Sequence, residues 1–270
     1  MQQFSLSANI EEGLSKNFQY IVTPNARDVA SGLVDGYRTG IHSFTIIGSY
    51  GLPSLLALEK DLQSKGSYSL LNPQTLSANA KFDVLKIVGD YKDLVSLMRD
   101  KLSVDGTADN VLDRLREIYN QAKKQGKFLV IFIDEFGKVL EHAAKNNPEQ
   151  ELYFMQKLAE FVNVSTRQIL LVTTLHQNFS AYARKLSTLQ KEEWTKVKGR
   201  FKELVFIEPV EQLLYLASTQ LNAKNDVGVN AESMEKLCQL AKATKFVSDG
   251  FNSDTANALY PLEPFSAYAM

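Results

Sequence analysis

The stretch that decides the fold is Lys127-Phe-Leu-Val-Ile-Phe-Ile-Asp134-Glu135. Its apolar run, Phe128 to Ile133, ends in two adjacent carboxylates. An unbroken apolar run is typical of a parallel strand that is buried on both faces. Carboxylates are almost never buried unpaired, so the chain should surface at Asp134. Ligands of open α/β sheets bind just beyond the carboxyl ends of the strands. The alternative is a buried strand whose end happens to be acidic.

The composition is that of a soluble globular protein with one large domain or two small ones. The chain has 270 residues, of which 44% are hydrophobic and 23% are charged. Its 30 basic and 31 acidic residues predict no strong attraction of the whole chain to nucleic acid or to membranes. A single cysteine excludes an intrachain disulfide and a cysteine-based zinc site, and it fits a cytoplasmic location. Without a signal-peptide pattern or an apolar stretch of about 20 residues, we expect no membrane partner.

Apolar runs alternate with segments of helical periodicity along most of the chain. The segments with spacings of three and four predict helices that lie on a sheet. Strands that alternate with helices imply a mainly parallel α/β sheet. The expected strands are 43–48, 82–88, 127–133, 168–174 and 203–207, and the expected helices between them are 54–64, 91–102, 110–124 and 149–162.

The pattern changes after residue 208. Segments 210–221 and 231–243 read as two helices with no strand between them, and 247–258 reads as a polar loop. We therefore expect an α/β core over 1–208. Residues 209–270 are expected to form a small helical lid and the start of a truncated C-terminal region.

A glycine-bearing turn follows the first expected strand and precedes an amphipathic helix. It reads Gly48-Ser49-Tyr50-Gly51. The N–H groups of such a turn can fold around a phosphate. Gly48, Ser49, Tyr50, Gly51 and, at the start of the helix, Ser54 are therefore the candidate nucleotide-binding residues.

Strand, glycine turn, helix and a later apolar run ending in Asp-Glu together resemble a P-loop ATPase of the AAA/STAND type, over roughly residues 20–245. The resemblance implies a three-layer α/β sandwich whose five strands have the order 5-1-4-3-2. It implies ATP and Mg²⁺ as cofactors and nucleotide hydrolysis as the activity. Asp134 would hold the metal and Glu135 would activate water.

Two further roles follow from the same resemblance. Thr174, at the end of the fourth strand, would sense the γ-phosphate, and His176 and Gln177 lie nearby. Arg200 would act as an arginine finger in this subunit or in a neighbouring one, which allows a homo-oligomer. The alternatives are a strand end that turns polar at the solvent for Thr174, and a solvated basic face for Arg200.

The phosphate loop departs from the family pattern. A working loop reads G-x-x-x-x-G-K-[ST], whereas this chain has Pro53, Ser54 and Leu55 where Gly, Lys and Ser or Thr belong. A deletion of about three residues across the lysine explains the difference. The lost lysine would have neutralised phosphate charge. We therefore expect impaired nucleotide binding. The alternative is a loop that binds phosphate through backbone groups alone.

The segment Asp134-Glu-Phe-Gly-Lys-Val-Leu-Glu141 and the closing Leu259-Tyr-Pro-Leu262 also resemble the large ATPases of bacterial phage-defence loci. That resemblance implies DNA or other defence-system subunits as partners. Two readings without catalysis stay open beside the ATPase. One is a catalytically dead pseudo-ATPase scaffold, which the missing lysine favours, and the other is a DNA-associated regulator in a defence complex.

Overall fold

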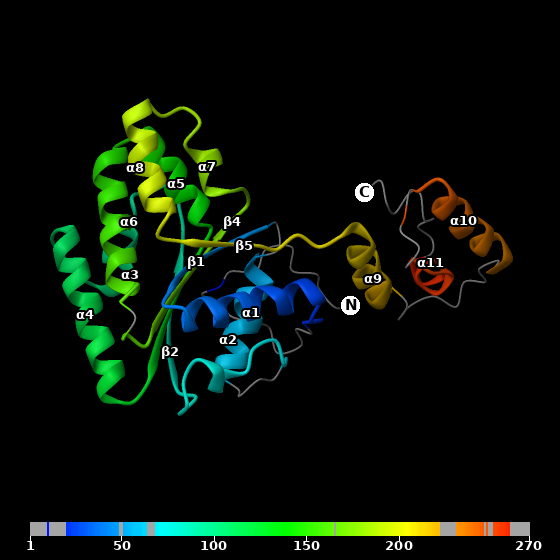
Figure 1. Cartoon of the computed structure of the whole chain (residues 1–270), viewed down its shortest axis with the longest axis horizontal. Coiled ribbons are helices and arrows are strands. Elements are labelled where there is room, and N and C mark those ends of the chain that lie inside the picture. Colours follow the sequence, from blue (N-terminus) through cyan, green and yellow to red (C-terminus); the bar gives the residue numbers. More distant parts are fainter. Residues whose placement is uncertain are drawn as a thin grey trace. The chain divides into compact units, whose positions relative to one another are not determined.

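The computed structural model describes residues 10, 20–48, 51–63, 68–164, 166–221, 231–245, 247 and 251–259. The chain divides into two compact units, residues 1–207 and 208–270. The first unit holds the sheet, and the second is built of helices (Figure 1). Each unit is described by itself below.

The sheet of the first unit has five strands, and every neighbouring pair is parallel. Its order, β2-β3-β4-β1-β5, is the expected 5-1-4-3-2 read from the opposite edge, so the predicted fold class is confirmed. The observed limits differ from the expected ones by a few residues at most. The strands are β1 (Ser43–Ile47), β2 (Phe82–Val88), β3 (Phe128–Asp134), β4 (Ile169–Leu175) and β5 (Lys202–Val205).

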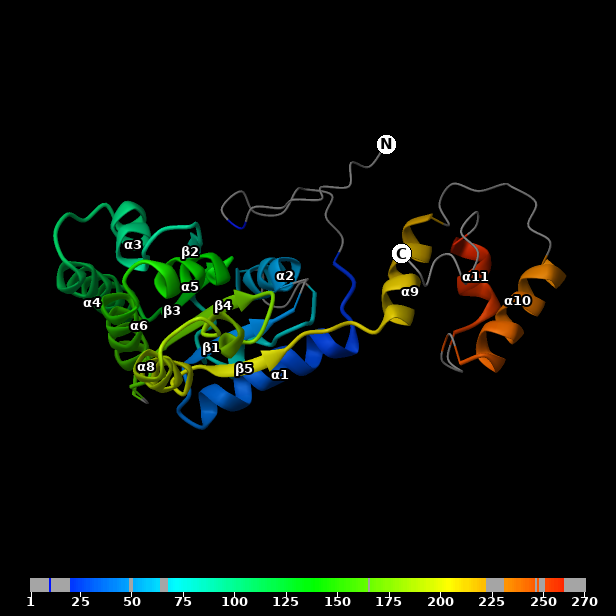
Figure 2. The same ribbon diagram turned by 90° about the horizontal axis from the view of Figure 1, so that it is seen from above.

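Helices cover both faces of this sheet, as the two views show (Figures 1 and 2). Alternation along β3 separates two cores. Phe128, Val130 and Phe132 pack in the cluster that includes α1 and α2 residues, whereas Leu129 and Ile131 pack in the cluster of α3 to α8. The helices of this unit are α1 (Pro24–Arg38), α2 (Gly51–Gln63), α3 (Leu94–Leu102), α4 (Ala108–Lys124), α5 (Phe136–Lys145), α6 (Pro148–Val162), α7 (Phe179–Tyr182) and α8 (Thr188–Lys198), with a 3₁₀ turn at η1 (Pro73–Thr75).

The second unit contains α9 (Val210–Leu221), α10 (Ala231–Ala243) and α11 (Ser253–Leu259). The prediction of a loop over 247–258 was wrong, because α11 begins inside it. Asn252 Oδ1 accepts a hydrogen bond from the Thr255 N–H at 2.8 Å, and Ala256 and Leu259 are buried at helical spacing. No helix in the described parts of either unit is long and apolar enough to cross a bilayer.

A buried carboxylate fixes the segment that follows α2. Asp61 is fully buried, and its two oxygens accept hydrogen bonds from the N–H groups of Tyr68, Leu70 and Leu71 at 2.6, 2.7 and 2.9 Å. A buried carboxylate is tolerated when it is satisfied in this way. The contact holds α2 to the chain that leads into β2.

We expect Asp61→Ala to destabilise the first unit by about 3 kcal/mol, because it leaves three N–H groups without their acceptor. Urea unfolding followed by circular dichroism measures this loss. Asp100→Ala, at an exposed carboxylate on α3, is the control and should change the midpoint little. Equal midpoints for Asp61→Ala and the natural chain would contradict the assigned role.

Candidate functional site

The parallel sheet brings the glycine turn and the acidic strand end to the same rim. Gly48 follows β1, Asp134 ends β3, and β4 lies between these two strands. The Gly48 N–H donates to the carbonyl oxygen of Leu175, the last residue of β4, at 2.8 Å. Asp134 and Thr174 share the sheet face of Phe132 and Val172, two residues earlier in each strand, and that face is covered by α1 and α2. The candidate site is therefore at the carboxyl rim, on the α2 face.

Asp134 and Thr174 are joined directly. The Thr174 hydroxyl donates to Asp134 Oδ1 at 2.6 Å, and it accepts from the Glu135 N–H at 3.1 Å. Asp134 is only 5% exposed, so the expectation that the chain surfaces at this residue was wrong, because Thr174 satisfies the carboxylate inside the fold. Burial raises the pKa of Asp134 above its ordinary value, and the hydrogen bond from Thr174 opposes the rise. The predicted γ-phosphate sensor thus contacts the predicted metal ligand, and both are polar groups held inside the rim.

Glu135 has an unusual backbone and a side chain with two partners. Its φ of 53° and ψ of 32° lie in the left-handed region, which costs a non-glycine residue about 1 kcal/mol. Glu135 Oε1 lies 3.3 Å from His176 Nε2, and Oε2 lies 3.6 Å from Lys138 Nζ. The Glu135 side chain is 32% exposed, so it borders on solvent, unlike the buried Asp134.

Two glycines allow the close approach of backbones at this rim. A Cβ at Gly48 would overlap the carbonyl oxygen of Phe206, beyond the end of β5. A Cβ at Gly89, just after β2, would overlap the carbonyl oxygen of Glu135. Both positions therefore require glycine for steric reasons, and Gly89 was missed by the sequence analysis.

The rest of the predicted phosphate loop is only partly described. Ser49 and Tyr50 lie outside the described residues. Gly51 is the first residue of α2, which begins three residues earlier than expected, and Ser54 lies in its first turn. No side-chain placement is described for either residue. Their phosphate contacts therefore stay predictions.

Arg200 is at the other rim of the sheet. It precedes β5, and its carbonyl oxygen accepts from the Ser43 hydroxyl at 2.6 Å, at the start of β1. Its guanidinium Nη2 donates to Glu160 at 2.7 Å. The length of β1 separates it from Gly48 by roughly 15 Å. The structure therefore does not bring Arg200 to the candidate site of its own chain.

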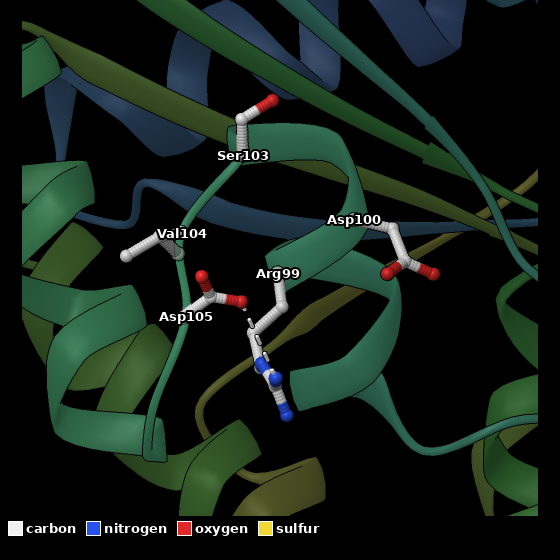
Figure 3. A pocket seen from close by; sticks show the side chains of 5 residues that line it. All are labelled: Arg99, Asp100, Ser103, Val104 and Asp105. Carbon is white, nitrogen blue, oxygen red and sulfur yellow. Dashed lines mark ion pairs between the residues drawn. The ribbon is translucent and has the colours of Figure 1, made fainter.

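Two hollows among the described residues lie away from the carboxyl-rim residues. One, of about 430 Å³, is lined in part by Asn163, Arg200 and Lys202. The other, of about 310 Å³, lies at the end of α3 (Figure 3). In it the Arg99 guanidinium is 3.9 Å from the Asp105 carboxylate, which is fully exposed. Neither hollow is lined by Gly48, Asp134, Glu135 or Thr174.

Sequence reasoning named His176 only as a neighbour of Thr174, and it did not name Lys138 or Tyr182. The sequence could have indicated the contact between Lys138 and Glu135, because side chains three residues apart lie on the same face of a helix. For Tyr182 there was no such indication, since its hydroxyl meets Gly137 through the tertiary fold alone. The approach of His176 to Glu135 also depends on the fold, because the two residues are 41 positions apart.

Strand order and layers together define a three-layer α/β sandwich around a five-stranded parallel sheet, with the strand order that the sequence resemblance implies. No family model and no curated protein matches the sequence. Several solved structures are similar. The ORC2 protein of Aeropyrum pernix, in ADPNP and ADP complexes, has a TM-score of 0.46 and 14% identity, over 92% of this chain and 71% of that one.

In two other similar structures, a smaller share of the solved chain is matched. Cdc6p of Pyrobaculum aerophilum has a TM-score of 0.41 and 14% identity, over 74% of this chain and 50% of that one. PCH-2 of C. elegans has a TM-score of 0.45 and 13% identity, over 92% of this chain and 63% of that one. With TM-scores below 0.5, this likeness says nothing about the activity of the chain.

We expect Asp134→Asn to raise the stability of the fold at neutral pH by about 1 kcal/mol. The pKa of Asp134 is raised by burial, so the folded state binds the proton more tightly than the unfolded state. Stability is then lost as the pH rises from the ordinary carboxyl pKa through the raised one. An amide avoids this loss and can still accept from Thr174.

Thermal unfolding at a series of pH values tests this, with Asp100→Asn as the exposed control. The advantage of Asp134→Asn should shrink towards about pH 4, where the natural carboxylate also gains a proton. A lower midpoint than that of the natural chain at neutral pH would show that the carboxylate stabilises the fold.

Proposed function

We propose that this chain is a nucleotide-binding module of the ATPase type, which acts on Mg·ATP and is impaired by its degenerate phosphate loop. One observation carries the proposal. Gly48, Asp134 and Thr174 meet at the carboxyl rim, on the face of the sheet covered by α2, and the helix that follows the glycine turn is α2 itself. Ligands of open α/β sheets bind at this rim.

The donor set suits a magnesium ion. Mg²⁺ prefers hard oxygen ligands, and it is bound in nucleotide sites through one or two carboxylates together with phosphate oxygens. Asp134 supplies such a carboxylate, and the Thr174 hydroxyl that holds it is also a hard oxygen. Among the described residues no three acidic, histidine or cysteine side chains gather into a metal cage. When bound, the ion would neutralise charge on the phosphates.

The residues around Asp134 have separate roles in this proposal. Asp134 holds the metal directly or through water. Glu135, half-exposed beside it, orients the attacking water and accepts its proton. Thr174 keeps Asp134 in place and reports the presence of the γ-phosphate. Backbone N–H groups of the segment that follows Gly48, up to Gly51, cradle phosphate, whereas the Gly48 N–H is held by the Leu175 carbonyl oxygen.

Arg200 fits this scheme only if it acts on the site of a neighbouring subunit. Its place at the amino rim excludes it from the site of its own chain. Its side chain is paired with Glu160 and is 32% exposed. A guanidinium offered by another copy would stabilise the charge of the transition state. The proposal therefore includes assembly of several copies.

The pseudo-ATPase scaffold is the second candidate, because Pro53, Ser54 and Leu55 replace the residues that bind phosphate and metal in a working loop. Involvement in phage defence, with DNA or other subunits as partners, rests on the sequence resemblance alone. Its check is an affinity for duplex DNA that falls as salt rises, and no dependence on salt would argue against direct contact with the DNA backbone.

We expect a fluorescent ATP analogue to bind more tightly with Mg²⁺ than without it. A dissociation constant below about 100 µM, equivalent to about −5.5 kcal/mol, supports a working site. Asp134→Ala should remove the dependence on Mg²⁺, and Asp100→Ala should leave it unchanged. Weaker binding that is the same with and without Mg²⁺ would favour the scaffold.

We expect Glu135→Gln to abolish ATP turnover and to keep ATP binding, in a form whose loop has been restored to Gly-Lys-Ser. The amide preserves the shape of the side chain but cannot accept the proton of the attacking water. Phosphate release measures turnover, and the fluorescent analogue measures binding. Unchanged turnover in the variant would reject the role of Glu135.

A further inference from the structure

The side chain of Glu135 is held between two elements that are distant in the sequence. His176 comes from the turn between β4 and α7, and Lys138 comes from the first turn of α5. Each binds a different oxygen of the carboxylate, at 3.3 Å and 3.6 Å. The carboxylate therefore has one preferred direction even though it borders on solvent.

The backbone of Glu135 is fixed as firmly as its side chain. Its N–H donates to the Thr174 hydroxyl, and its carbonyl oxygen accepts from the Lys138 N–H at 3.0 Å. Gly89 packs against that carbonyl. A left-handed residue persists only where its surroundings determine it so fully. With the backbone fixed, the direction of the carboxylate depends on the side-chain partners.

The turn that carries His176 is itself anchored. The Tyr182 hydroxyl packs against Gly137 in the first turn of α5 and interacts with Gln177, next to His176. Tyr182 is only 8% exposed. The Phe179 N–H, at the start of α7, donates to Glu203 Oε1 of β5 at 3.1 Å. The imidazole is thus carried on a braced turn, although its own side chain is 63% exposed.

We propose that His176 is a positioning residue for Glu135, holding the carboxylate in the direction needed to take a proton from water. The inference rests on the function proposed above and assigns His176 a role that acts through Glu135. His176 Nε2 carries the proton and donates it to the hydrogen bond with Oε1. Lys138 is the weaker partner, since its longer distance and flexible stem define direction poorly.

The contact is tested without nucleotide. The chain has three histidines, so its imidazole rings can be resolved in a long-range ¹H–¹⁵N spectrum. We expect His176 to be the Nε2–H tautomer in the natural chain and to become a mixture of tautomers in Glu135→Ala. A mixture already present in the natural chain would overturn the proposal.

The role is tested by steady-state kinetics of phosphate release, in the natural chain and in the form with the restored loop. His176→Ala should lower kcat by about ten-fold or more, as misplacement of a catalytic group does, with KM for ATP unchanged. His176→Gln, which keeps an N–H donor, should recover most of the loss. Lys191→Ala, on the exposed face of α8, is the control.

The outcomes separate the two proposals. Turnover that depends on Glu135 but is unaffected by His176→Ala overturns the positioning role and leaves the proposed function standing. A change in KM alone, or no recovery by glutamine, also overturns it. No turnover in either form rejects the proposed function and the positioning role together, and the ring spectrum then reports a purely structural contact.

Discussion

The hydrogen bond from Thr174 to Asp134 is the contact on which the arrangement of the candidate site depends. It ties the end of β3 to the end of β4 at the carboxyl rim of the sheet. The same hydroxyl accepts the N–H of Glu135, so one threonine sets the place of both acidic residues. Removing it would leave a buried carboxylate without its nearest donor.

The fold was largely predictable from the sequence, because strands buried on both faces and helices at three- and four-residue spacing leave strong patterns. The sequence also predicted correctly that the glycine turn at Gly48 and the acidic strand end at Asp134 lie at the same rim of the sheet. The loop expected over 247–258 was wrong because the helical spacing runs from Ala256 to Leu259, which lies just beyond that polar segment.

The details of the candidate site were less accessible to sequence reasoning. Residues joined by the fold alone, such as Glu135 and His176, leave no periodic signal, and neither does the packing of Gly89 against a carbonyl. For Arg200, the residue type alone suggested the wrong position. Its residue type suited a phosphate, but only the parallel register shows that β5 starts at the rim opposite Gly48. Topology, not residue type, decided where it could act.

The position of Arg200 also constrains how copies of this chain could associate. A site at one rim that needs a guanidinium from the other rim cannot be completed by a two-fold axis through either rim, since such an axis brings like surfaces together. Either two copies lie antiparallel about a two-fold axis midway between the rims, or each copy presents its amino rim to the carboxyl rim of the next. Contacts of that head-to-tail kind close into a ring when the rotation between copies divides a full turn, and otherwise they propagate as a helical filament.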